Sequence, residues 1–321
     1  MRSPGPSQPS FLFKNGSGRV SSRTKRSSAE PTAEIVSIGN ELLIGHTLDT
    51  NSHWLAIQLN RRGWVLQRVT QLRDSLDSIT SGVREAVLRK PLVLITLGGL
   101  GPTYDDMTLA GIARALHRPL RLNREALRLV EEHYRRLETR PKLTKYRTKM
   151  ATLPRGATPL PNPVGTAPGV MMKESSTTIF SLPGVPSEMK AIFRTSIASF
   201  LTASGAGPPR EFQFKIAGII ESALAPILDE ARRAYPGLYF KSHPRGRETG
   251  PRPLILLHIY STRPRSAEEV ARAAEYIIRR ISGSIRNQRS YYCQEDRGLV
   301  PIRWPLGPFR LLIGCSTRRG S

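Results

Sequence analysis

The feature that most restricts the fold of this chain is a continuous apolar run at residues 92–97, followed at once by the glycine-rich segment 98–101. A strand in which Thr96 is the only polar residue is typical of a sheet that is covered on both faces. Apolar strands alternate with amphipathic helices around this run from Glu34 onward. Because this alternation favours right-handed crossovers, it predicts an α/β domain with a mostly parallel sheet between two layers of helices.

The expected elements of this domain lie between residues 33 and 204. Asp77 and Asn123 are expected to cap helices, and residues 154–168 to be irregular because they contain many prolines and glycines. The predicted strands are residues 34–39, 64–70, 92–97 and 178–182, and the predicted helices are 51–62, 77–89, 108–116, 123–137 and 187–201.

A second, smaller part of the chain is predicted at residues 210–283. Its order is strand 211–217, helix 221–234, strand 238–242, strand 254–260 and helix 267–281. This order fits a small α+β lobe with its helices on one face of the sheet. Residues 1–32 are rich in Ser, Pro, Gly and Arg and are expected to form a disordered basic tail. Residues 287–321 lack periodicity and are expected to be an irregular tail.

The chain is strongly basic, with a formal net charge of +24. The excess is spread along the chain and no RNA- or DNA-binding motif is visible, so nonspecific affinity for polyanions stays open while a dedicated nucleic-acid function is not indicated. The only two cysteines, Cys293 and Cys315, form neither a C-x-x-C metal motif nor a secreted disulfide framework. No apolar run is long enough to span a bilayer, and a cytoplasmic location without membrane attachment is expected.

The strongest candidate loop runs from Gly98 to Thr108. Its glycines allow backbone N–H groups to approach an anion at the start of a helix. Asp105 and Asp106 are adjacent carboxylates of the kind that hold a divalent cation against phosphate oxygens. The alternative is a tight turn in which Asp106 only caps a helix. No Gly-Lys-Ser or Gly-Lys-Thr follows, so the loop is not of the Walker type.

Two further loops each follow a predicted strand and precede a helix, at residues 39–52 and 183–188. Ligands of open α/β sheets bind beyond the carboxyl ends of the strands, so the three loops are expected to converge on one crevice. Asn51 is equally well explained as a ligand contact or as a helix cap, and Glu188 is also an ordinary residue for a helix start. His46 and His53 are expected at the surface. A proline- and glycine-rich loop at 162–169 could close over a ligand.

Taken together, segments 38–55, 98–116 and 150–193 closely resemble the N-terminal domain of the competence/damage-inducible CinA family, a branch of the MoaB/Mog-like molybdopterin-binding superfamily. The resemblance covers about residues 33–281. It implies a three-layer molybdopterin-binding-like fold and a homo-oligomer. It also implies a small-molecule nucleotide or pterin ligand and metal-dependent hydrolysis of ADP-ribose at its pyrophosphate. Superfamily relatives instead bind or adenylylate molybdopterin in molybdenum cofactor biosynthesis.

The same resemblance implies roles for individual residues. Glu41, Asp105 and Asp106 are the expected catalytic residues, and Asp105 and Asp106 also the expected ligands of a divalent cation such as Mg, Mn or Co. The expected phosphate- and substrate-binding residues are Gly39, Asp49, Asn51, Gly98, Gly99, Gly101, Thr103, Thr108, Asn162, Gly165, Thr166, Gly184 and Glu188.

Two departures from the family pattern limit these expectations. Many relatives have an aspartate where this chain has Asn40, so a charged role at that position is not expected. The nicotinamide mononucleotide deamidase domain of bacterial CinA proteins has no counterpart in the sequence, and deamidase activity is not expected. Two other functions stay open beside pyrophosphate hydrolysis: molybdopterin binding or adenylylation, and noncatalytic nucleotide binding.

Overall fold

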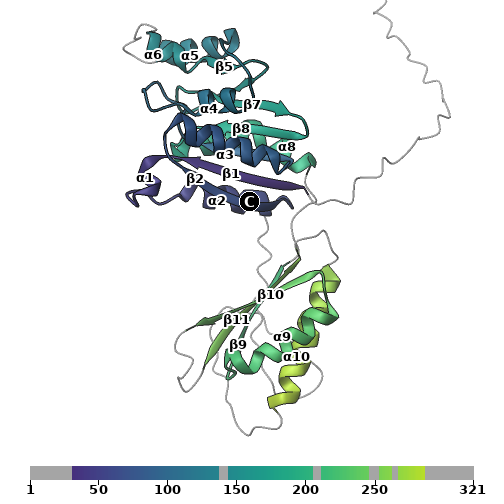
Figure 1. Ribbon diagram of the computed structural model, residues 1–321. Coiled ribbons are helices and arrows are strands. Elements are labelled where there is room, and N and C mark those ends of the chain that lie inside the picture. Colours follow the sequence, from purple (N-terminus) through teal and green to yellow (C-terminus); the bar gives the residue numbers. More distant parts are fainter. Residues whose placement is uncertain (1–30, 137–143, 205–210, 246–252, 262–266, 286–321) are drawn as a thin grey trace, which may run out of the picture.

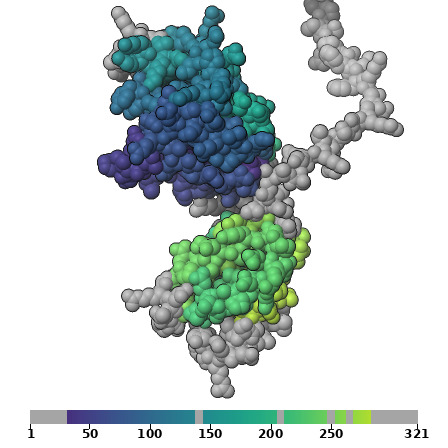
Figure 2. Space-filling model, in the orientation of Figure 1, coloured from purple at the N-terminus to yellow at the C-terminus, as the bar shows by residue number. Residues whose placement is uncertain are grey.

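The computed structural model describes residues 31–136, 144–204, 211–245, 253–261 and 267–285 (Figure 1). The described residues form two groups, coloured purple to teal and green to yellow in Figure 2, and these groups share neither a sheet nor a buried cluster. The predicted tails, apart from Pro31 and Thr32, and both cysteines lie outside the described residues. No helix in the described ranges is both long and apolar enough to cross a lipid bilayer.

The first group is built on a six-stranded sheet with the order β2-β1-β3-β8-β7-β6. Strands β2, β1, β3 and β8 run parallel to one another, whereas β7 pairs antiparallel with β8, and β6 pairs antiparallel with β7 at the edge. The sheet is therefore mostly parallel, as the sequence predicts. Its strands are β1 (Thr32–Ile38), β2 (Val65–Leu72), β3 (Val93–Leu97), β6 (Thr158–Leu160), β7 (Gly169–Glu174) and β8 (Thr177–Leu182).

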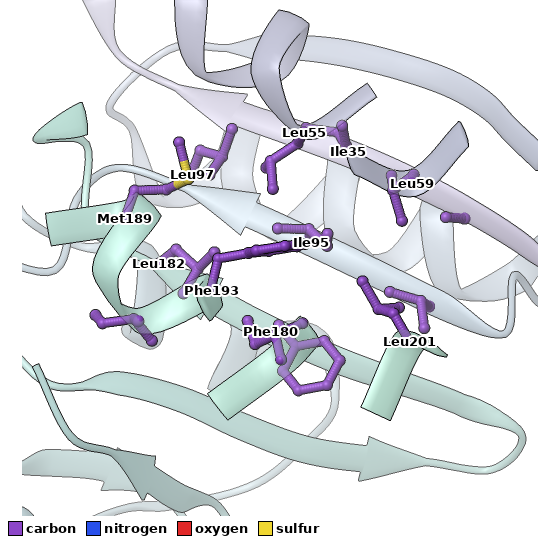
Figure 3. Close-up of a cluster of buried hydrophobic side chains, with 14 of the residues drawn as sticks. Ile35, Leu55, Leu59, Ile95, Leu97, Phe180, Leu182, Met189, Phe193 and Leu201 are labelled. Carbon is purple, nitrogen blue, oxygen red and sulfur yellow. The ribbon is translucent and has the colours of Figure 1, made fainter. Parts of the chain in front are cut away.

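Helices cover both faces of this sheet. One face packs against α2, α7, the π-helical turn η1 and α8 through a cluster that includes Leu55, Phe180 and Phe193 (Figure 3). The other face packs against α3, α4 and α5 through Ile79, Ile112 and their neighbours. The three-layer α/β prediction is thus confirmed. These helices are α2 (Thr50–Asn60), α3 (Leu76–Leu88), α4 (Thr108–Ala115), α5 (Arg124–Arg136), α7 (Pro186–Ile192), η1 (Phe193–Ile197) and α8 (Ala198–Ser204), with the short α1 (Asn40–Leu43) and α6 (Lys145–Lys149) beside them.

The start of α3 differs from the prediction. Ser75, not Asp77, is the N-cap, and its hydroxyl accepts a hydrogen bond from the Ser78 N–H. Asp77 lies in the first turn, where its carboxylate pairs with Arg114 of α4 at 2.7 Å. Asn123 caps α5 as predicted, because its side-chain oxygen accepts the Ala126 N–H at 2.9 Å.

The prediction of an irregular segment at residues 154–168 is wrong in part. Pro154 ends β5 (Thr152–Pro154), which pairs with β4 (Leu120–Leu122), and β6 pairs with β7. Pro159 is tolerated in β6 because this strand is at the edge of the sheet, where one side of the backbone needs no partner. Residues 161–168 do lack helix and strand.

The second group is a three-stranded antiparallel sheet with the order β10-β11-β9. Helices α9 and α10 pack on one of its faces, around a cluster that includes Phe214, Leu257 and Ile277. The small α+β lobe is present as predicted, with longer elements than expected at its C-terminal side. Its elements are β9 (Glu211–Ala217), α9 (Glu221–Ala234), β10 (Leu238–Arg245), β11 (Leu254–Ser261) and α10 (Ala267–Ile285).

Candidate phosphate-binding site

The loops after the four parallel strands meet at one edge of the six-stranded sheet. Strand register places the ends of β2, β1, β3 and β8 side by side, with Ile38 opposite Leu72 and Leu97 opposite Leu182. A cavity of about 500 Å³ lies beyond these ends. The convergence expected from the sequence is therefore present, and the cavity is lined by residues from all four loops.

Most of the predicted site residues line this cavity. A second part of its wall comes from Tyr134 and Met150, which the sequence did not single out. The predicted residues on the wall are Gly39, Glu41, Gly98, Gly99, Gly101, Thr103, Asp105, Asp106, Thr166, Gly184 and Glu188.

The glycine loop at the end of β3 is closely packed against its surroundings. Gly98 has φ +91°, and a Cβ there would lie 2.3 Å from the Ile38 carbonyl oxygen. Its N–H is donated to the Leu182 carbonyl at 2.9 Å. Gly98 therefore lets the loop after β3 lie directly against the backbone of Ile38. The Gly98 N–H is not available to a ligand, which corrects part of the phosphate-binding prediction. Within the described residues, the N–H groups of Gly99, Leu100 and Gly101 have no hydrogen-bond acceptor.

Thr108 does not line the cavity but holds the glycine loop in place through hydrogen bonds. Its side chain is fully buried, and its hydroxyl donates to the Gly98 carbonyl at 2.9 Å. Its N–H donates to the Gly99 carbonyl at 3.2 Å. The start of α4 is thereby fixed to the glycine loop, so that Thr108 positions the residues that face the cavity.

Asp105 and Asp106 converge on the same side chain. The Thr103 hydroxyl lies 2.5 Å from Asp105 Oδ1 and 2.5 Å from Asp106 Oδ2. The Lys149 ammonium donates to the Thr103 carbonyl. The hydrogen bond from the Thr103 hydroxyl, the Asp105 N–H and the nearby Lys149 charge lower the pKa of Asp105 below its ordinary value. The two carboxylates thus form a pair at the cavity wall rather than pointing apart.

Glu41 and Asp74 line another part of the wall. The Glu41 carboxylate lies beside Gly39, where a Cβ would be only 2.4 Å from its Oε1 atom. Asp74 accepts the Asn40 N–H at 2.7 Å and so joins the loop after β2 to the start of α1. Asp74 is not among the site residues predicted from the sequence. Its position just after a strand that ends at Leu72 is the same signal that identified the other loops.

Glu188 is held in place by two predicted residues that do not themselves line the cavity. Asn162 donates to Glu188 Oε2 at 2.6 Å and accepts the Gly165 N–H at 2.9 Å. A Cβ at Gly165 would lie 2.1 Å from the Glu188 carboxyl carbon. The 161–168 segment is therefore anchored to α7, and Asn162 and Gly165 position Glu188 instead of contacting the cavity.

Asp49 and Asn51 also lie outside the cavity wall. Asp49 caps α2 and accepts the Ser52 N–H at 2.9 Å and the Ser37 hydroxyl at 2.7 Å. Burial raises the pKa of Asp49, but the hydrogen bonds outweigh it and leave the pKa below its ordinary value. Asn51 donates to the Gly184 carbonyl at 2.7 Å and so links α2 to the loop after β8. Both residues therefore stabilise the site's frame. His46 and His53 are exposed, as predicted.

A cation at this site would have few protein ligands. Across the described ranges, no group of three or more His, Cys, Asp or Glu side chains is arranged to hold a metal ion. Asp105 and Asp106 supply two carboxylates, which is a donor set that suits Mg²⁺ only when phosphate oxygens and water complete the shell.

The chain is similar to a family of known proteins over the whole of the first group. The model of the family described as "Probable molybdopterin binding domain" matches residues 34–203. The chain belongs to this family. The molybdopterin-binding superfamily predicted from the sequence is thereby confirmed.

Relatives with uninformative names extend the similarity beyond that domain. A protein of Aeropyrum pernix is 42% identical over 267 residues, which cover 81% of this chain and 98% of the relative. A protein of Pyrobaculum arsenaticum is 44% identical over 234 residues, covering 72% of this chain and 86% of the relative. Among solved structures, a CinA protein of unknown function from Thermoplasma acidophilum is 35% identical, with a TM-score of 0.49, covering 53% of this chain and 98% of its own.

Proposed function

We propose that this chain binds a nucleotide diphosphate such as ADP-ribose in the cavity and hydrolyses its pyrophosphate with the help of a divalent cation. The observation that supports the proposal is the meeting of three different groups at one cavity. These are the free backbone N–H groups of the glycine loop, the Asp105–Asp106 pair and the Glu41 carboxylate. Each group suits a different part of the reaction at phosphorus.

The glycine loop is proposed to hold phosphate oxygens. Gly99, Leu100 and Gly101 offer consecutive N–H groups that have no acceptor among the described residues, close to the N-terminus of α4. Backbone donors at a helix N-terminus attract anions because their dipoles are aligned toward the ligand. A phosphate group in this position would lie beside the two aspartates.

Asp105 and Asp106 are proposed to hold the cation together with the substrate's phosphate oxygens. A bound Mg²⁺ or Mn²⁺ would neutralise charge on the diphosphate and favour ionisation of an attacking water. The Thr103 hydroxyl keeps both carboxylates on the same side of the loop. The Asp105 carboxylate is ionised at neutral pH, and its lowered pKa extends the ionised range to lower pH.

Glu41 is proposed to accept the proton from the attacking water, as a general base must lie within hydrogen-bond reach of the reacting group. Tyr134 and Met150 are proposed to contact the heterocycle of the ligand. The Arg147 guanidinium lies 4.4 Å from the Tyr134 ring centroid and fixes one face of that ring. Residues near the cavity therefore provide both a polar end for phosphate and a less polar end for a flat ring.

The family match favours a second candidate, which is the binding of molybdopterin without hydrolysis of a diphosphate. Molybdopterin also joins a phosphate to a heterocycle, so the same glycine loop and the same tyrosine suit it. The two candidates differ in what Asp105 and Asp106 do. Hydrolysis requires them for turnover, whereas binding alone requires the glycine loop more than the aspartates.

Incubation of the purified protein with ADP-ribose and Mg²⁺, Mn²⁺ or Co²⁺, followed by chromatography for AMP, tests the proposal. AMP is expected with the wild-type protein, and Asp105→Asn is expected to lower the rate about 100-fold or more. Asp77→Asn, a matched substitution outside the cavity, should leave the rate unchanged. If no AMP forms and a pterin copurifies with the protein, the second candidate is favoured. Binding of ADP-ribose without AMP would indicate a noncatalytic nucleotide-binding module.

A further inference from the structure

The three-stranded sheet has one face that neither of its helices covers. Helices α9 and α10 both pack on the opposite face (Figure 1). Because side chains alternate along a strand, every second residue of each strand points to the uncovered face. This face, called the open face below, carries Glu211, Gln213, Lys215 and Ala217 of β9, Tyr239, Lys241, His243 and Arg245 of β10, and Leu254, Leu256, His258 and Tyr260 of β11.

Aromatic rings lie next to one another at one end of the open face. Tyr239 is directly opposite Tyr260 in the strand register, and their ring centroids are 4.9 Å apart. The His258 ring is 4.8 Å from the Tyr260 ring and bonds Glu211 through Nε2 at 3.0 Å. The Tyr239 side chain is large and aromatic, and the residue is 49% exposed. The exposed Tyr239 ring, with the half-buried Tyr260 ring beside it, offers a stacking surface for flat ligands.

Cations follow the rings along the same face. Lys241 is opposite His258, Lys215 is opposite Leu256, and Arg245 is opposite Leu254. All three cations are exposed, and none has a hydrogen bond or an ion pair with another described residue. Among the described residues of the open face, Glu211 is the only acidic side chain, and it bonds His258. The open face therefore carries unneutralised positive charge beside its aromatic rings.

We propose that the open face binds single-stranded nucleic acid, with bases stacked on Tyr239 and Tyr260 and phosphates paired with Lys241, Lys215 and Arg245. Bases of a single strand are free to stack on protein rings, whereas bases inside a duplex are not. Exposed and unpaired cations complement a phosphate backbone better than they complement an ordinary protein surface. Tyr239 and Arg245 are six residues apart on one strand, which corresponds to about 20 Å and to several nucleotides. This activity is separate from the proposed hydrolysis at the first sheet.

Fluorescence anisotropy with the full-length protein and labelled single-stranded oligonucleotides, oligo-dT and oligo-U, tests the proposal. Tyr239→Ala is expected to weaken binding about tenfold, since one stacked base is lost. Tyr239→Phe keeps the aromatic ring and should bind as tightly as the wild-type protein. Tyr146→Ala, which removes a tyrosine that is 60% exposed in the first group, is the matched control and should have no effect.

The charge contribution is tested in the same assay as a function of salt concentration. Lys241→Glu is expected to weaken binding and to lower the salt dependence by about one released counterion. Lys173→Glu changes the net charge equally but lies on β7 of the first sheet, and it should have little effect. The proposal is overturned if the two lysine variants behave alike, if Tyr239→Ala binds as wild type, if a duplex of the same length binds as tightly, or if no oligonucleotide binds. Thermal unfolding of each variant confirms that the fold is kept.

Discussion

Asp105 and Asp106 are neighbours in the chain, but their surroundings differ. Asp105 is exposed, and its partners are the Thr103 hydroxyl and its own N–H. Asp106 is half-buried, and its Oδ2 atom also accepts the Thr103 N–H at 2.8 Å. A Cβ on Gly101 would lie 2.6 Å from that oxygen, so the Asp106 carboxylate packs directly against the loop. Asp106 therefore supports the loop and faces the cavity, whereas Asp105 only faces the cavity.

This difference predicts different effects on stability. Asp106→Asn is expected to lower the free energy of unfolding by about 1 kcal/mol, because a neutral amide weakens the charge-assisted bond from Thr103. Asp105→Asn is expected to lower it less, because the Asp105 carboxylate is exposed and does not accept the Thr103 N–H. Both variants should lose AMP formation. Urea unfolding followed by circular dichroism checks the stabilities, and equal destabilisation by both substitutions would contradict the assigned roles.

Asp49 predicts a dependence of stability on pH. Its pKa in the folded protein lies below the ordinary value of 3.8, so the carboxylate contributes stability that is fully present above about pH 4. That contribution is lost as the pH falls through the lowered pKa. Asp49→Ala is expected to cost about 1 kcal/mol at pH 7, as for other lost helix caps, and less at pH 3. Urea unfolding of both proteins at the two pH values measures this, and a cost that is the same at both would show that Asp49 has no such role.

At the residue scale, the sequence predicted correctly which loops form the cavity. It predicted less well which side chains in those loops line it. Asp49 and Thr108 were expected to contact the ligand, but their hydrogen bonds turn them toward the backbone. Both are polar residues at the start of a helix. A polar residue there can cap the helix, bond the neighbouring loop or contact a ligand, and the sequence alone does not distinguish these roles. Asp74 was missed because β2 extends to Leu72, two residues further than predicted.

At the scale of elements, a partly buried ion pair joins β1 to the end of α3. The Glu34 side chain is almost fully buried, and Arg89 binds it through Nε at 2.8 Å and a terminal nitrogen at 2.7 Å. The hydrogen bonds that Arg89 donates to the Glu34 carboxylate, together with the charge of that carboxylate, raise the pKa of Arg89 above its ordinary value. A carboxylate in the first strand of a covered sheet is tolerated only because this guanidinium neutralises it.

Removing the arginine alone should therefore be costly. Arg89→Met is expected to destabilise the fold by about 3 kcal/mol, since an uncompensated charge remains buried. Arg84→Met on the exposed face of the same helix is the control and should cost less than about 0.5 kcal/mol. Chemical denaturation gives both values. Equal effects of the two substitutions would mean that the Glu34–Arg89 ion pair does not contribute specifically to the free energy of unfolding.

The central strands and their helices were predictable because each combines a clear hydrophobic period with a turn or cap signal. The edge elements β4, β5 and β6 were not. Each is three residues long, and β5 and β6 contain proline, which argues against a strand in the absence of information about its neighbours. Their pairing is decided by distant residues, such as Val170 opposite Pro159.

At the scale of the whole molecule, the six-stranded and the three-stranded sheets have separate cores. The clusters of the first group contain described residues between Ala33 and Leu201, and the cluster of the second contains residues between Phe212 and Ile281. A domain with its own core can fold alone. The boundary predicted from the sequence near residue 204 is consistent with this separation.

A chain that ends at Ser204 is therefore expected to fold and to keep ligand binding at the cavity. Its thermal unfolding should be cooperative, and its affinity for ADP-ribose should be within about twofold of that of the full chain, because no residue of the second group lines the cavity. Calorimetry measures both quantities. Loss of cooperative unfolding would show that the first group depends on the rest of the chain.

The proposed function depends on a cation that a diphosphate and the Asp105–Asp106 pair hold jointly. Electron paramagnetic resonance of Mn²⁺ with the non-hydrolysable diphosphate α,β-methylene-ADP tests it most directly. The signal of free Mn²⁺ is expected to fall when protein and diphosphate are both present, well beyond its fall with either alone. The Asp105→Asn/Asp106→Asn protein should abolish this difference. Mn²⁺ binding that is the same without the diphosphate, or that is unchanged in the double variant, would contradict the account.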